Sequence, residues 1–260
     1  GGDPSAVAAL LAAAADRGAL LQLSNAIDNV PSRTAFSDAP ILLIAAAASL
    51  PETRRLAVVR LLVNGGASVN TIRRGVGGTA LIAASANGAA TIVQFLLRHG
   101  AHAARIRPAK VVDGVVVRSG ASPLSIAALR GHADVVRCLL RSGRVRVDDM
   151  HGIGATALFA AALNGHLECA RVLLDAGASP HFAKPSNGAT PAFAAASNGH
   201  AAALEVLLKV PDCDVNQAMR GGRTPSFVAA QEGHATALGL LAEAPGCDLN
   251  QATDDGRTPA

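Results

Sequence analysis

Histidine is the residue in this chain whose type and spacing most suggest a chemical role. Four of the eight histidines follow a glycine at intervals of 34 residues, in the pairs Gly131-His132, Gly165-His166, Gly199-His200 and Gly233-His234. Histidine binds metal ions and relays protons near neutral pH, but a metal site needs ligands that converge on one point. Side chains that recur once per unit are spread along the molecule instead. We therefore interpret these four histidines as structural.

Other residues that could bind a metal ion or take part in catalysis form no recognisable motif in the sequence. His99 and His102 have the HxxH spacing, and Cys138 is a conceivable third ligand, but the pattern supplies no fourth ligand, so a solvated loop is the better interpretation. The glycine-rich segment Gly75-Val76-Gly77-Gly78 lacks the lysine and hydroxyl residue of a phosphate-binding loop. HExxH and GxSxG motifs are missing from the sequence. The sequence thus predicts no catalytic residue, no metal and no cofactor.

The elements that hold these residues repeat with one period. Threonine or serine recurs every 34 residues, at Ser122, Thr156, Thr190, Thr224 and Thr258. A fixed period of this size indicates a stack of small units, each of which buries its apolar face against the next. In the unit that begins at Ser122, a first helix is expected to start at Pro123 and end at Gly131. Apolar residues at helical spacing then predict a second helix that ends before Gly143.

These units resemble ankyrin repeats. The family pattern T-P-L-H-x-A-A-x-x-G-H is matched at Thr190-Pro191-Ala192 and Gly199-His200, and the later V-V-x-x-L-L segment is matched at residues 135–140. The resemblance covers nearly the whole chain. It implies an all-α fold, namely an ankyrin-repeat solenoid of stacked helix-turn-helix units with β-hairpin loop tips. It also implies a non-catalytic module for protein–protein interaction, acting as a scaffold or adaptor.

The period divides residues 1–260 into units of one ankyrin-repeat domain. The expected units are an N-terminal capping unit at 4–30, a repeat with an inter-helix insertion at 36–72, a repeat with a long hairpin loop at 75–118, four regular repeats at 119–152, 153–186, 187–220 and 221–254, and the start of a further repeat at 255–260. The last residues, Thr258-Pro259-Ala260, open a repeat without a polar cap, and no initiator methionine is present. We therefore expect the chain to be part of a longer protein.

The sequence departs from the regular 34-residue pattern in three places, and each departure leads to a specific prediction. The extra residues of the second unit are expected between its two helices, around residues 49–55. Asp113-Gly114, between two runs of valine, predicts a two-residue turn in an elongated β-hairpin. The histidine of the T-P-L-H pattern is replaced in every unit, and its place is taken by Ile82, Ser125, Phe159, Phe193 and Phe227. The three consecutive phenylalanines predict an apolar ladder between repeats.

Composition and charge limit the possible partners. The longest apolar run, residues 39–50, is too short to cross a membrane. Four cysteines without CxxC spacing indicate free thiols, which favour an intracellular, cytoplasmic location.

Charge is distributed unevenly along the chain. Residues 98–146 carry a net charge of +8 and residues 147–260 carry −6, so the basic region could attract an acidic segment of another protein. Arginines that only solvate the outer helices would produce the same pattern. Nucleic acid is disfavoured because the chain has few aromatic residues to stack on bases.

By the family resemblance, partners bind at the loop tips and at the inner face of each first helix. The candidate loop-tip residues are Val76, Arg118, Ile153, Arg220 and Arg223. The candidate inner-helix residues are Asn87, Leu129, Arg130, Leu163, Asn164, Ser197, Asn198, Gln231 and Glu232. Two alternative functions stay open at this point. The chain could be the targeting or regulatory arm of a larger enzyme or channel, or a structural subunit of a large assembly. The partner's identity and the oligomeric state do not follow from the sequence.

Overall fold

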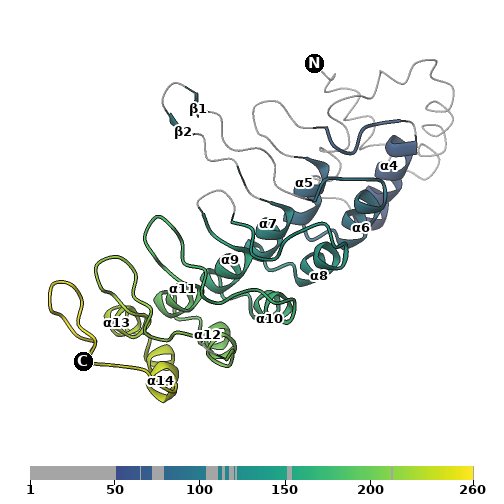
Figure 1. The fold of residues 1–260 in the computed structure, drawn as a ribbon. Coiled ribbons are helices and arrows are strands. Elements are labelled where there is room, and N and C mark those ends of the chain that lie inside the picture. Colours follow the sequence, from purple (N-terminus) through teal and green to yellow (C-terminus); the bar gives the residue numbers. More distant parts are fainter. Residues whose placement is uncertain are drawn as a thin grey trace.

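Two parallel rows of helices form the described part of the molecule (Figure 1). The computed structural model describes residues 51–64, 66–71, 79–103, 111–112, 115–116, 120, 122–150, 154–211 and 213–259. The expected capping unit at 4–30 and the first helix of the unit at 36–72 lie outside these residues. Consecutive helices alternate between the two rows, so each inner helix and the outer helix that follows it form one unit.

Among the described residues, the inner row consists of five helices of seven residues each: α5 (Ala80–Ala86), α7 (Pro123–Leu129), α9 (Ala157–Leu163), α11 (Pro191–Ser197) and α13 (Pro225–Gln231). Each begins after a threonine or serine whose side-chain oxygen accepts a hydrogen bond from the backbone N–H three residues later, as in Thr190 and Phe193 at 3.1 Å. This bond satisfies one of the N–H groups that a helix start leaves without a partner. The periodic threonine and serine residues are thus N-caps, which explains why they recur.

The outer row consists of longer helices: α4 (Glu52–Asn64), α6 (Ala90–Arg98), α8 (Ala133–Arg141), α10 (Leu167–Asp175), α12 (Ala201–Leu208) and α14 (Ala235–Glu243). Each outer helix packs on the next outer helix and on the inner helix of its own unit where that helix is described. Leucine and valine fill the outer row, whereas alanine dominates the buried positions of the inner row. Small side chains let the inner helices approach closely.

The solenoid predicted from the sequence is therefore confirmed, with two details to add. The extra residues of the second unit were expected to connect its two helices around residues 49–55. This prediction is wrong for residues 52–55, because they form the first turn of α4. Strands β1 (Val111–Val112) and β2 (Val115–Val116) pair antiparallel, with Val112 opposite Val115, which is the register expected of a hairpin with a two-residue turn. The rest of this hairpin lies outside the described residues, so its elongated shape stays a prediction.

Helix length bears on membrane insertion. Among the described residues, every helix is too short or too polar to span a bilayer.

Candidate binding surface

The Gly-His pairs form the contact that aligns neighbouring units. The Nε2 atom of His132 lies 3.0 Å from the carbonyl oxygen of Ala86, and His166 makes the same contact with Leu129 at 3.0 Å. Because a carbonyl oxygen only accepts, the ring nitrogen is the donor. His234 bonds to the carbonyl of Ser197 at 3.2 Å in the same way. Each of these histidines satisfies a carbonyl at the end of the preceding inner helix, which confirms their structural role.

Glycine is required on the other side of the same contact. Gly131 has a φ angle of 78°, and a Cβ atom placed there would lie 2.7 Å from Nδ1 of His166. The equivalent clash at Gly165 involves His200, at 2.6 Å. The glycine therefore provides both the left-handed backbone and the space for the next imidazole ring.

A second series of bonds joins the loops that follow the outer helices. Asn216 donates to the carbonyl of Gly246 at 2.6 Å and accepts from the N–H of Asp248 at 2.9 Å. Asn70 makes the equivalent two bonds with Gly100 and His102 of the unit that follows it. Asp148 replaces asparagine in another unit and accepts from the N–H of Ser179 at 3.1 Å. Burial raises the pKa of Asp148, and the bond from Ser179 partly opposes that rise.

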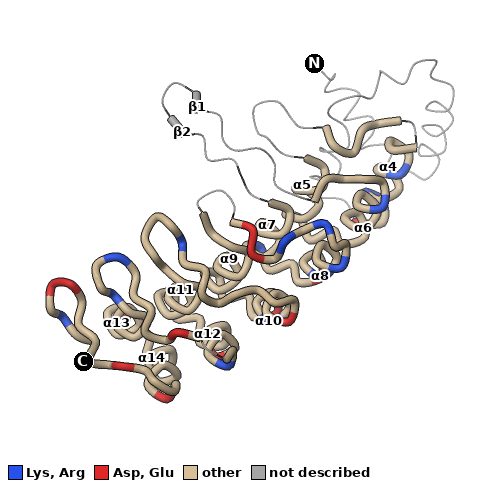
Figure 2. The backbone as a smooth tube through the Cα atoms, in the orientation of Figure 1, with Lys and Arg blue, Asp and Glu red and all other residues tan. Residues whose placement is uncertain are grey.

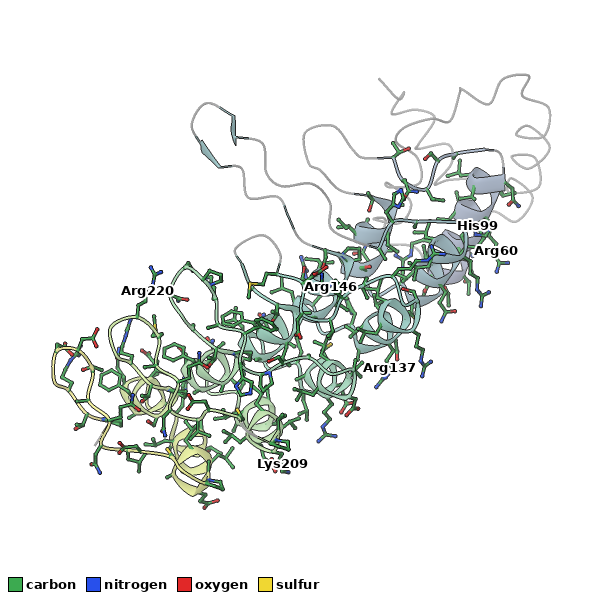
Figure 3. All side chains as sticks on the ribbon, viewed as in Figure 1. Arg60, His99, Arg137, Arg146, Lys209 and Arg220 are labelled. Atoms are coloured by element: carbon green, nitrogen blue, oxygen red, sulfur yellow. The ribbon has the colours of Figure 1, made fainter. Side chains whose placement is uncertain are left out.

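The loops that precede the inner helices, which we call fingers, contact each other through the backbone. Arg220 donates its N–H to the carbonyl of Asn187 at 2.7 Å, and the N–H of Asp254 donates to Gly221 at 3.2 Å. The Arg220 side chain also reaches the carbonyl of Pro185 at 3.3 Å, and Figure 3 shows it projecting from its finger. These bonds tie the described fingers together without the histidine of the family pattern.

The three phenylalanines that replace this histidine are buried. Phe159, Phe193 and Phe227 are 5%, 7% and 5% exposed. Within the described part of the chain, the ring–ring contact found is between Phe95 and His99, so the predicted ladder consists of separately buried rings rather than stacked ones. The guanidinium of Arg257 lies 5.6 Å from the ring centre of Phe227 and covers it.

The predicted inner-helix residues lie together at the C-terminal ends of the inner helices. Leu129 and Leu163 are 38% and 36% exposed, although both are large and apolar. They hold equivalent positions on α7 and α9, which pack against each other. Arg130, Asn164, Asn198 and Glu232 follow as the C-cap residues of their helices and are also exposed. We name Leu129, Arg130, Leu163, Asn164, Ser197, Asn198, Gln231 and Glu232 the inner surface.

Some inner-surface side chains already have partners within the chain. The amides of Asn164 and Asn198 donate to the carbonyls of Ala160 and Ala194, at 2.9 and 3.0 Å, and so cap their own helices. Gln231 donates to Glu232 at 3.3 Å.

The other candidate residues are not included in the inner surface. Asn87 is the half-buried C-cap of α5. Arg223, in the finger before α13, is half-buried, and its backbone carbonyl accepts from Met219. Val76, Arg118 and Ile153 lie outside the described residues.

The described residues of the basic region lie in two places. Arg130 ends an inner helix, whereas Arg98, Arg137 and Arg141 lie on the outer row. Figure 2 shows basic residues at α8, a basic stretch followed by an acidic one in the loop after α8, and acidic residues at α10, α14 and the last finger. Arg137 pairs with Asp134 at 2.8 Å and approaches Glu168 at 3.7 Å. The charge pattern along the sequence does not distinguish these two locations.

The described thiols and metal-binding side chains can be assessed one group at a time. All four cysteines are free. Burial raises the pKa of the Cys169 thiol to about 11, although Arg137 acts in the opposite direction. A thiol with a raised pKa is a poor nucleophile at neutral pH. In the described ranges, histidine, cysteine, aspartate and glutamate do not gather into a group of three that could hold a metal.

Comparison with known proteins supports the assignment of the fold. The family model described as "Ankyrin repeats (3 copies)" matches residues 107–184 and 177–253, which together are more than half of the chain. The chain belongs to the ankyrin-repeat family. Among solved structures, the human ASB11 ankyrin repeat domain is similar, with 25% sequence identity and a TM-score of 0.70. This similarity covers 85% of the present chain and 90% of that ankyrin chain. No curated protein matches the sequence significantly.

Proposed function

We propose that this ankyrin-repeat chain is a non-catalytic scaffold or adaptor, which binds another protein through the inner surface and the loop tips. Ankyrin repeats are generally modules for protein–protein interaction. The observation that carries the proposal is the exposed pair Leu129 and Leu163 on adjacent inner helices. Large apolar side chains on neighbouring elements, beside an exposed arginine, have the composition of an interface centre.

The charges of the inner surface favour a particular orientation of the partner. Arg130 lies beside Leu129, and Glu232 lies three units further along the row. A partner with an apolar centre and an acidic segment near Arg130 fits this order. The free cysteines favour an intracellular, cytoplasmic setting for the interaction.

The test is affinity capture and cross-linking mass spectrometry in native extract with two matched variants. Leu129→Ser/Leu163→Ser removes the apolar pair without touching a buried residue, whereas Lys209→Ser alters the outer row. We expect a partner that is cross-linked to the inner surface of the wild type and the Lys209 variant. Its affinity for the leucine variant should fall at least roughly tenfold.

Two results would contradict this function. Equal binding of the partner by both variants would show that the inner surface does not carry recognition. An intrinsic enzymatic activity that is lost on substitution of one residue would show that the chain is not a passive scaffold.

A further inference from the structure

A basic cavity lies on the outer row, away from the inner surface. It has a volume of about 330 Å³ and is found between the C-terminal ends of α6 and α8. Its lining residues are Gln94, Leu97, Arg98, Cys138, Arg141, Ser142 and Arg144. We name it the α6–α8 pocket. Three of its side chains carry a guanidinium group, and none of the lining residues is acidic.

The position of two of these arginines in the repeat is informative. Arg98 and Arg141 occupy the same place at the end of α6 and α8. The corresponding residues of the other outer helices are Asn64, Asp175, Lys209 and Glu243. Lys209 is neutralised by Glu205 at 2.6 Å. Two basic residues in this place on adjacent helices therefore occur only at this point of the described stack.

The positive charge of the pocket is not balanced from within. Among the described residues, no carboxylate lies within ion-pair distance of Arg98, Arg141 or Arg144. Arg144 donates to the carbonyl of Leu97 at 3.1 Å, which brings its guanidinium back to the end of α6. A helix C-terminus favours a nearby cation. This partly explains why Arg98 lies at the end of α6 and Arg141 at the end of α8. The third guanidinium adds repulsion that an anion would relieve.

The size and lining of the pocket indicate the class of anion. Arginine guanidinium groups bind phosphate oxygens through paired hydrogen bonds. The volume exceeds that of a phosphoryl group alone and leaves room for the side chain that carries it. Aromatic rings that could stack on bases are missing from the lining, which disfavours nucleic acid. Gln94 and Cys138, which are joined by a bond of 3.2 Å, form a polar but uncharged wall.

We propose that the α6–α8 pocket binds the phosphoryl group of a phosphorylated serine or threonine on a partner protein. Arg98 and Arg141 contact its oxygens, and Arg144 supplies further positive charge. The pocket is independent of the inner surface, so either site can fail without the other. It gives the molecule a second binding face, which responds to phosphorylation of the partner.

The test is fluorescence anisotropy with the full chain and a fluorescein-labelled peptide, Gly-Ala-Ala-phosphoserine-Ala-Ala-Gly. Its unphosphorylated form, a labelled twelve-residue thymidine oligonucleotide and inorganic phosphate as competitor complete the set of probes. We expect the phosphopeptide to bind at least about tenfold more tightly than its unphosphorylated form, because charge-assisted bonds are lost with the phosphate. Inorganic phosphate should displace it.

Charge-matched variants distinguish the pocket from general attraction. Arg98→Gln/Arg141→Gln should weaken phosphopeptide binding at least about tenfold. Arg171→Gln/Lys209→Gln removes the same charge from the outer row outside the pocket and should change binding less than about twofold. Equal losses in both variants, or equal binding of the two peptides, would overturn the proposal. Tighter binding of the oligonucleotide, abolished by the pocket variant, would overturn it in favour of nucleic acid.

Discussion

The contact between glycine and histidine shows how a single residue can serve two units. Gly131 ends one inner helix with a left-handed backbone, and its missing side chain leaves room for His166 of the next unit. His166 in turn bonds to Leu129, which belongs to the inner surface. The same contact therefore aligns the helices and fixes the backbone at the end of the proposed binding site.

Gly131→Ala tests this double role against Gly143→Ala. Gly143 also has a positive φ, of 64°, but a Cβ atom there would meet nothing within 4 Å. Backbone strain alone should cost Gly143→Ala about 1 kcal/mol of unfolding free energy. Gly131→Ala should lose about 1–3 kcal/mol more, because the new methyl group displaces His166. Urea unfolding followed by circular dichroism measures both, and equal losses would show that the ring does not limit the position.

At the scale of the element, the inner helices depend on the N-cap residue that precedes them. They are seven residues long, and isolated helices of that length are not stable in water. Their N-caps are buried, and Thr190 is 2% exposed. A lost cap bond would therefore leave a buried N–H without a partner.

Thr190→Ala should lower the free energy of unfolding by about 1 kcal/mol. Thr190→Ser retains the acceptor oxygen and should stay close to the wild type, as the natural Ser122 cap suggests. Thermal unfolding of the two variants under the same conditions is the measurement. A serine variant as unstable as the alanine variant would attribute the effect to the methyl group of threonine instead.

Elements with strict spacing could be predicted from the sequence. The inner helices that follow Ser122, Thr156, Thr190 and Thr224, and the glycines that end them, follow from the 34-residue period, because each has a fixed position in its unit. The candidate residues of the inner surface follow from the family resemblance instead. The α6–α8 pocket was missed, because 43 residues separate Arg98 from Arg141 and the loop insertion hides their equivalence. The first turn of α4 was missed for a related reason. A count of inserted residues does not show whether they lengthen a helix or a loop.

At the scale of the whole molecule, stability is distributed along the stack. Each unit contacts mainly its neighbours, so cooperativity depends on the interfaces between them. Leu173 and Leu241 hold equivalent positions in α10 and α14, and both are fully buried. They differ in that α10 packs on an outer helix on each side, whereas α14 packs on α12 alone among the outer helices described.

Leu173→Ala and Leu241→Ala should each cost about 2–5 kcal/mol locally. The consequences should differ in extent. Leu241→Ala should accelerate amide hydrogen exchange mainly in residues 225–243, whereas Leu173→Ala should accelerate it in α8 and α12 as well. Hydrogen-exchange mass spectrometry separates these patterns. Uniform acceleration over all helices in both variants would mean that the stack unfolds as one unit.

The histidine contacts also have an evolutionary consequence. Gly131, Gly165 and Gly199 each leave room for the histidine of the unit after them, and His132, His166 and His234 each bond back to a carbonyl of the unit before them. These are the two complementary halves of one joint, so a tandem duplication of a 34-residue segment creates a new junction that already fits. Such a duplication would lengthen the stack without altering the exposed side chains of the existing units.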